Sequence, residues 1–242
     1  MISRISLALL ACATVLPAQG LGGFLKKPAA PAASTSTVDV GSALASGAAM
    51  IGFVTVATDQ GMKAVDTMLE MFPAEKVAKV KKLSAQYAEL SAKRKDGNID
   101  AEQLKVASAA GDEMAALQGD WKSYKKEKAS AVSKANGRLG LMLGADAIAA
   151  SAAPKTLATL QEAGKSLASN PLQAGKAAQV TAQISLLTAV VQQIPQQTKS
   201  FTTVRGIVAN IAKAEKVSLA ADLSPDKIKD SAALSASAKE LD

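Results

Sequence analysis

Histidine is absent from this chain of 242 residues, and the single cysteine, Cys12, lies in an apolar stretch near the N-terminus. Histidine is the usual proton shuttle near neutral pH, and histidine and cysteine together supply most protein ligands for zinc, copper and haem. These absences exclude Ser-His-Asp triads, Cys-His dyads and CxxC redox pairs. The remaining carboxylates, lysines and hydroxyls form no catalytic pattern, so we expect a protein that is not an enzyme and that holds no cofactor or metal.

Aromatic residues make up only 3% of the chain, and no run of alternating β-branched residues is present. From residue 39 onward the composition favours helix, because alanine, leucine, lysine, glutamate and glutamine are frequent. Apolar residues recur at three- and four-residue steps, as in Val77, Val80, Leu83 and Tyr87, which is the period of an amphipathic helix. We therefore predict an all-α fold, an elongated bundle of long antiparallel helices with coiled-coil-like packing in a single domain.

Residues 1–20 have the features of a secretory signal peptide. Arg4 precedes an apolar run over residues 5–16, and the small-residue triplet at 18–20 suits signal peptidase. The apolar run is too short to span a bilayer. We therefore expect cleavage near Gly20 and a periplasmic or secreted protein of the bacterial envelope.

A second processing signal overlaps the first. Residues 9–12, Leu-Leu-Ala-Cys, resemble a bacterial lipobox, in which the cysteine is acylated. Acylation of Cys12 would make the chain an outer-membrane lipoprotein, and this alternative stays open. Residues 21–38 are rich in proline, alanine, serine and threonine, with too few large apolar side chains to fold, so we expect a disordered linker.

Helix-breaking and capping residues divide the rest of the chain. Pro73 interrupts the first periodic segment, residues 96–98 (Asp-Gly-Asn) favour a turn, and Asp100 with Gln103 has the spacing of a capping box. The bundle domain is expected at 39–223, followed by a weakly helical or disordered tail at 224–242. The predicted helices lie at about 40–72, 74–95, 100–136, 138–152, 155–168, 171–194 and 197–221.

The uncharged stretch 40–58 is the strongest candidate for a functional segment, because its length approaches that of a membrane span. Met50, Ile51, Phe53 and Val54 are its candidate residues for contact with a membrane or a partner. We favour a buried position within the bundle, since alanine and glycine make the stretch only mildly hydrophobic. The alternative is insertion into a membrane.

Residues 139–153 form a second apolar stretch, in which Asp146 is the only charged residue. We expect Asp146 at the edge of its helix, where its carboxylate reaches water or a lysine. The favoured function is binding or scaffolding by an exported helical bundle, with a protein or another envelope component as partner. The alternative is a membrane-active, pore-forming-like or lipid-carrying protein that uses residues 40–58 and 139–153.

The chain is basic, with a formal net charge of +7. This balance permits attraction to anionic lipid, cell-wall polymer or nucleic acid. Its lysines are interleaved with acidic residues, and Tyr87, Trp121 and Tyr124 fit core positions better than a platform for stacking bases. We therefore expect no nucleic-acid partner, while contact with a membrane stays open. The sequence does not determine the oligomeric state.

Overall fold

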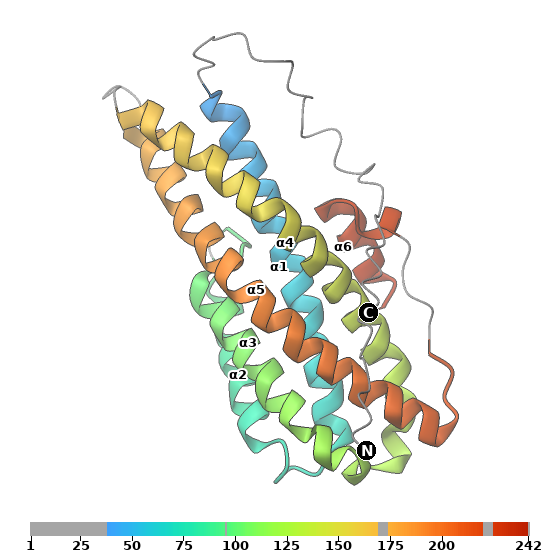
Figure 1. Cartoon of the computed structure of the whole chain (residues 1–242). Helices are drawn as coiled ribbons and strands as arrows, with labels where there is room; N and C mark the ends of the chain where they lie inside the picture. The colour runs from blue at the N-terminus through green and yellow to red at the C-terminus, as the bar shows by residue number, and fades with distance from the viewer. Residues whose placement is uncertain (1–37, 95, 169–173, 220–224, 242) are drawn as a thin grey trace, which may run out of the picture.

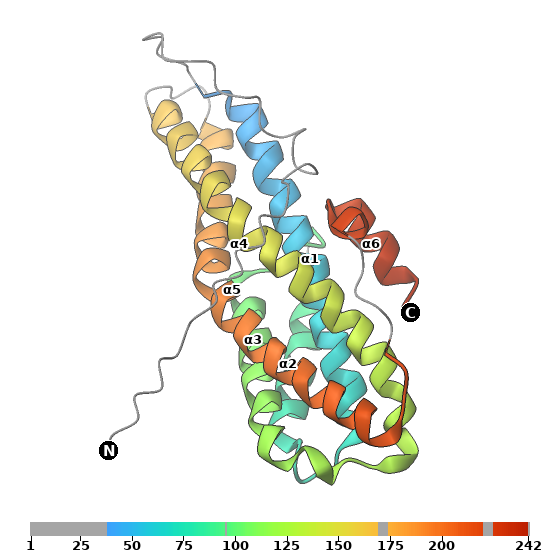
Figure 2. The ribbon, with the colours of Figure 1, turned by 45° about the vertical axis from the view of Figure 1, so that its right-hand side comes forward.

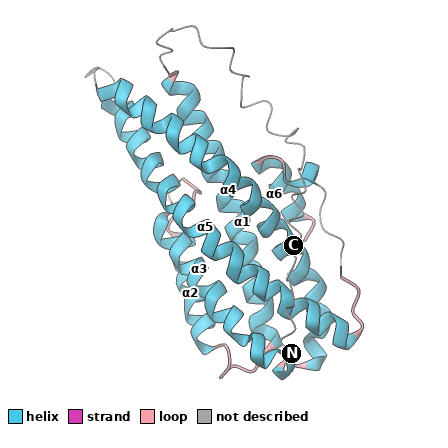
Figure 3. Cartoon of the chain, in the orientation of Figure 1, coloured by secondary structure: helices cyan, strands magenta, loops and turns pink. Residues whose placement is uncertain are grey.

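The computed structural model describes residues 38–94, 96–168, 174–219 and 225–241, which are helical and contain no strand (Figure 3). The prediction of an all-α bundle in a single domain is confirmed. The predicted signal peptide with Cys12, and all but the last residue of the predicted linker, lie outside the described residues.

Three long helices, α1, α4 and α5, run side by side along the molecule (Figure 1). Helices α2 and α3 pack against one half of their length, and the short helix α6 lies against α1 and α4 (Figure 2). The α-helices are α1 (Val40–Met71), α2 (Ala78–Ala92), α3 (Ala101–Ala115), α4 (Val132–Ala168), α5 (Ala174–Glu215) and α6 (Ser231–Lys239), and the 3-10 helices are η1 (Ala116–Ser123), η2 (Lys126–Ala131) and η4 (Pro225–Ile228).

Side-chain caps define where α1 and α3 begin. The carboxylate of Asp39 accepts hydrogen bonds from the backbone N–H groups of Gly41 and Ser42, at 3.1 and 3.3 Å. Asp100 and Gln103 form the predicted capping box, in which each side chain accepts from the other residue's backbone N–H, at 2.8 and 2.9 Å. Each cap stabilises its helix by about 1 kcal/mol.

Three predicted helix breaks are wrong, because α4 runs without interruption through residue 137 and Pro154, and α5 runs without interruption through Pro195. Both proline residues are exposed, whereas the neighbouring Ala153 and Ile194 are 1% exposed. A proline inside a helix costs about 3 kcal/mol. Burial of apolar side chains on both sides of each proline outweighs that cost, so the helix continues.

The predicted helix over 100–136 is also wrong, because α3 ends at Ala115 and the chain continues through η1 and η2. These turns reverse the chain before α4, and the backbone N–H of Lys125 donates to the carbonyl of Met71 at 2.7 Å. Leu117 and Ala129 are nevertheless buried in the common core. Their burial explains why the apolar pattern in the sequence runs on without a break.

The core is shared by the three long helices, and α5 contributes its apolar stripe. Leu187, Val190 and Ile194 are at most 1% exposed, whereas Ile184 and Val191 are partly exposed. The buried stripe of α5 therefore follows Leu187, Val190 and Ile194, with Ile184 and Val191 at its edges.

The C-terminal segment, expected to be a weakly helical or disordered tail, contains η4 and α6. Asp230 caps α6 by accepting a hydrogen bond from the backbone N–H of Ala233 at 2.8 Å. Leu234 is fully buried, and Ile228 is 8% exposed. These apolar side chains hold the segment against the bundle, where it closes one end of the groove described next.

Candidate functional site

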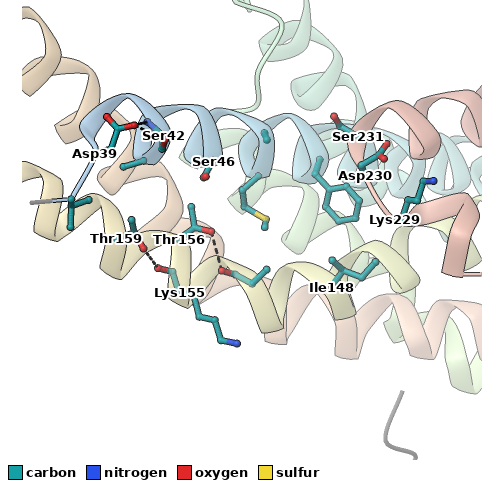
Figure 4. Close-up of a pocket in the computed structure, with 16 residues that line it drawn as sticks. Asp39, Ser42, Ser46, Ile148, Lys155, Thr156, Thr159, Lys229, Asp230 and Ser231 are labelled. Atoms are coloured by element: carbon teal, nitrogen blue, oxygen red, sulfur yellow. Dashed lines mark hydrogen bonds between the residues drawn. The ribbon is translucent and has the colours of Figure 1, made fainter. Parts of the chain in front are cut away.

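A groove of about 320 Å³ lies between α1 and α4 and ends at residues 229–231, where α6 begins (Figure 4). Its volume is at the lower end of the range for small-molecule sites. Its walls are built mainly from apolar and small side chains. They are Val38, Ala43, Ala49, Met50 and Phe53 from the α1 side and Ile148 and Ala152 from α4.

Hydroxyl groups form the polar part of the lining. Ser42 donates to the carboxylate of Asp39 at 2.6 Å, and Thr156 and Thr159 donate to backbone carbonyls of their own helix, each at 3.1 Å. These three hydroxyl hydrogens are therefore already engaged. The groove offers a ligand mainly apolar contacts, with oxygen acceptors at one side.

The charged groups of the lining balance each other. Asp39 and Asp230 cap α1 and α6, while Lys155 and Lys229 are exposed. The hydroxyl of Ser42 and two backbone N–H groups lower the pKa of the Asp39 carboxyl below its usual range. In Figure 4 the side chain of Lys155 points away from α1. Because both carboxylates cap helices and both lysines are exposed, the lining presents little charge to a ligand, and it suits a neutral or amphipathic molecule.

The four residues singled out in the apolar stretch 40–58 divide between two environments. All are less than a tenth exposed. Met50 and Phe53 line the groove, whereas Ile51 and Val54 do not line it and belong to the packed core. Sequence reasoning named the stretch 139–153, which contains Ile148 and Ala152 of the α4 wall. It did not place that stretch against α1 or find the end of the groove at residues 229–231, because these segments meet α1 only in the folded chain.

Helix α1 is also the one helix in the described ranges whose length and apolar composition would let it cross a membrane. Within its most apolar stretch of 18 residues, 44% of the residues are buried inside the bundle. A core helix of a soluble protein can have the same length and composition, so these properties alone do not distinguish a core helix from a membrane-spanning helix.

Asp146 lies in the interior and not at a helix edge, so that expectation is wrong. It is 1% exposed and accepts a hydrogen bond from Thr198 Oγ1 at 3.3 Å. It shares a face of α4 with Met142 and Ala149, which are also buried. Burial raises the pKa of Asp146 to about 7, and the Thr198 hydrogen bond opposes this only in part.

A second polar cluster joins α1 to the segment between α2 and α3. Arg94 donates to both carboxylate oxygens of Asp59, each at 2.9 Å, and Tyr87 donates to the same carboxylate at 2.6 Å. Burial and the nearby Asp59 carboxylate raise the pKa of Tyr87. Because these groups satisfy one another, the cluster is a structural clamp and offers no free acid or base.

Comparison with protein-family models, with curated proteins and with solved structures finds no match to this chain. Within the described residues, no group of three or more carboxylate, histidine or cysteine side chains is placed to hold a metal ion. The turn from Asp96 to Asp100 leads into the capping box of α3. The groove between α1 and α4 is the arrangement that best fits a ligand.

Proposed function

We propose that this chain is a non-enzymatic binding protein of the bacterial envelope whose groove holds the apolar part of a small amphipathic molecule. The observation that carries the proposal is the groove itself, with its apolar walls from α1 and α4 and its balanced charges. The hydroxyl–carboxylate pair in its lining, Ser42 with Asp39, belongs to the cap of α1, which supports binding over catalysis.

Export is part of the proposal and depends on the N-terminal sequence. The signal-peptide features of residues 1–20 support a periplasmic or secreted protein, and the lipobox-like segment ending at Cys12 supports the lipoprotein alternative. In either form the bundle would meet lipids or other amphipathic components of the envelope.

The membrane-active alternative would require α1 to leave the core. Ile51 and Val54 are 4% and 1% exposed, and Met50 and Phe53 are also buried. Exposing a buried side chain of this kind to water costs about 1.5 to 3 kcal/mol, so exposing these four costs roughly 6 to 12 kcal/mol, which contacts with a membrane would have to offset. The burial of α1 therefore favours binding by the intact bundle.

The first test is titration with 1-N-phenylnaphthylamine, whose fluorescence rises in an apolar environment. We expect saturable binding to the wild type and displacement by dodecanol and by dodecanoate to a similar degree, because the lining carries no net charge. The Ala152→Phe variant places a ring in the groove and should weaken probe binding at least about tenfold, since a filled site loses its apolar contacts.

The matched control is Ala158→Phe, which makes the same change at an exposed position of α4 outside the groove. Circular dichroism should show that both variants keep the helical content of the wild type. Equal probe binding by the two variants, or no saturable binding by the wild type, would refute the proposed site. Dye leakage from vesicles caused by the wild-type protein would favour the membrane-active alternative.

A further inference from the structure

The end of the bundle distant from residues 38–43 carries a concentration of exposed lysines. We infer that this surface, which we call the basic end, docks on an anionic phospholipid surface. The basic end comprises Lys122, Lys125, Lys126 and Lys128 of the η1–η2 segment and Lys213 and Lys216 at the end of α5, all of them exposed.

Contacts in the fold bring these lysines together although they are far apart in the sequence. The backbone N–H of Lys125 donates to the carbonyl of Met71 at the end of α1. The hydroxyl of Tyr124 donates to the carboxylate of Glu215 at the end of α5. The η1–η2 segment therefore lies across the ends of both long helices, as Figures 1 and 2 show.

Two of the acidic side chains near the basic end already interact with other residues. Asp120 forms an ion pair with Lys76 at 2.5 Å, and Glu215 accepts the hydrogen bond from Tyr124. Glu75 and Glu127 are exposed. None of the six lysines has an ion-pair partner among the described carboxylates. The surface therefore keeps an excess of positive charge, which attracts anionic headgroups.

Two aromatic rings at the same end distinguish a lipid surface from a nucleic acid. Trp121 and Tyr124 are partly exposed and stacked, with ring centroids 6.4 Å apart and planes inclined by 5°. The ammonium group of Lys122 lies 5.7 Å from the centroid of the Trp121 ring. Tyr124 and the Lys122 ammonium group already lie beside the Trp121 ring, which restricts the space for stacking with bases. Tryptophan and tyrosine beside lysine are typical of membrane–water interfaces.

The test is cosedimentation of the full chain with vesicles of phosphatidylcholine containing 30% phosphatidylglycerol, and with pure phosphatidylcholine vesicles. The neutral vesicles measure any partitioning caused by the apolar residues 5–16. We expect binding to the anionic vesicles well above this background, and weakening by high salt. Because each lysine near a charged membrane contributes separately, the Lys125→Ala/Lys126→Ala/Lys128→Ala variant should lower the partition coefficient about 100-fold.

The control variant Lys105→Ala/Lys165→Ala/Lys176→Ala removes the same charge from exposed positions on α3, α4 and α5 away from the basic end. It should keep most of the binding. Trp121 is the only tryptophan of the chain, so its fluorescence should shift to the blue on anionic vesicles.

Three results would overturn the inference. The first is equal loss of binding in both triple variants, which would indicate general charge attraction. The second is anionic-vesicle binding that is no stronger than the neutral background or that leaves the Trp121 emission unchanged, either of which would show that the basic end does not contact the lipid. The third is saturable binding to an oligonucleotide without binding to the anionic vesicles. The groove proposal is measured with a different probe, so the two can fail independently.

Discussion

At the scale of single residues, Asp146 is the side chain whose burial differs most from what the local sequence predicts. An aspartate in an apolar stretch is expected to reach solvent. Here the fold turns it inward, where burial raises its pKa to about 7. The carboxyl is therefore largely protonated in the folded chain below neutral pH and becomes a buried charge above it.

This raised pKa makes the stability of the fold depend on pH. In the unfolded chain the carboxyl has its ordinary pKa of 3.8. Between pH 4 and 7 the folded state binds more protons than the unfolded state, so stability falls as pH rises, and the loss is complete above about pH 7. Urea unfolding should show the contribution of Asp146 to the free energy of unfolding falling by roughly 3 kcal/mol between pH 5 and pH 8.

The Asp146→Asn variant removes the titrating group. We expect it to lose this part of the pH dependence and to exceed the wild type in stability at pH 8. The matched control is Asp96→Asn at an exposed turn position, which should follow the wild-type pH profile. If Asp146→Asn retains the full wild-type slope, Asp146 does not titrate as the buried site requires.

At the scale of elements, the approach of α3 to α5 depends on the absence of a side chain at Gly111. A Cβ atom there would lie 2.7 Å from Cε2 of Phe201, and Phe201 is fully buried. A ring enclosed by the core has little room to move. Gly111 therefore sets how closely these two helices pack.

Replacing Gly111 by alanine should lower the free energy of unfolding by about 1 to 3 kcal/mol, because the added methyl overpacks the contact with Phe201. The measurement is chemical denaturation. Gly206→Ala is the control, since no atom beyond its chain neighbours and the surrounding α5 backbone lies within 4 Å of the added carbon, and this change should stabilise the helix by up to about 1 kcal/mol. Stabilisation by both changes would show that α3 and α5 pack less closely than described.

At the scale of the whole molecule, one core joins the three long helices, so a disruptive substitution at its centre should destabilise the whole fold. Leu187 of α5 is fully buried. An aspartate at this position would place a carboxylate in the core with no ion-pair partner provided. We expect Leu187→Asp to lose cooperative thermal unfolding, measured by circular dichroism at 222 nm, or to melt at a much lower temperature.

Ser185→Asp is the control, because Ser185 is exposed on the same helix. It adds the same charge and should melt within a few degrees of the wild type, as surface substitutions usually do. A wild-type melting curve for Leu187→Asp would contradict the shared core.

The sequence by itself determined the helical class and the helix starts that depend on neighbouring residues. Composition and apolar period are local properties, and a cap such as Asp39 or the pair Asp100 and Gln103 needs only residues within one turn. The inward placement of Met50 and Phe53 agrees with the favoured interpretation of the stretch 40–58 as a buried helix.

Only the tertiary structure decided the features that depend on contacts between distant segments. Pro154 remains inside α4 because burial on both sides outweighs a lost hydrogen bond, and Asp146 is buried because α5 covers its face of α4. The groove needs α1, α4 and residues 229–231 at once. The free energy of such contacts comes from burying surfaces of segments that are distant in the sequence. A short stretch of neighbouring residues therefore cannot reveal them.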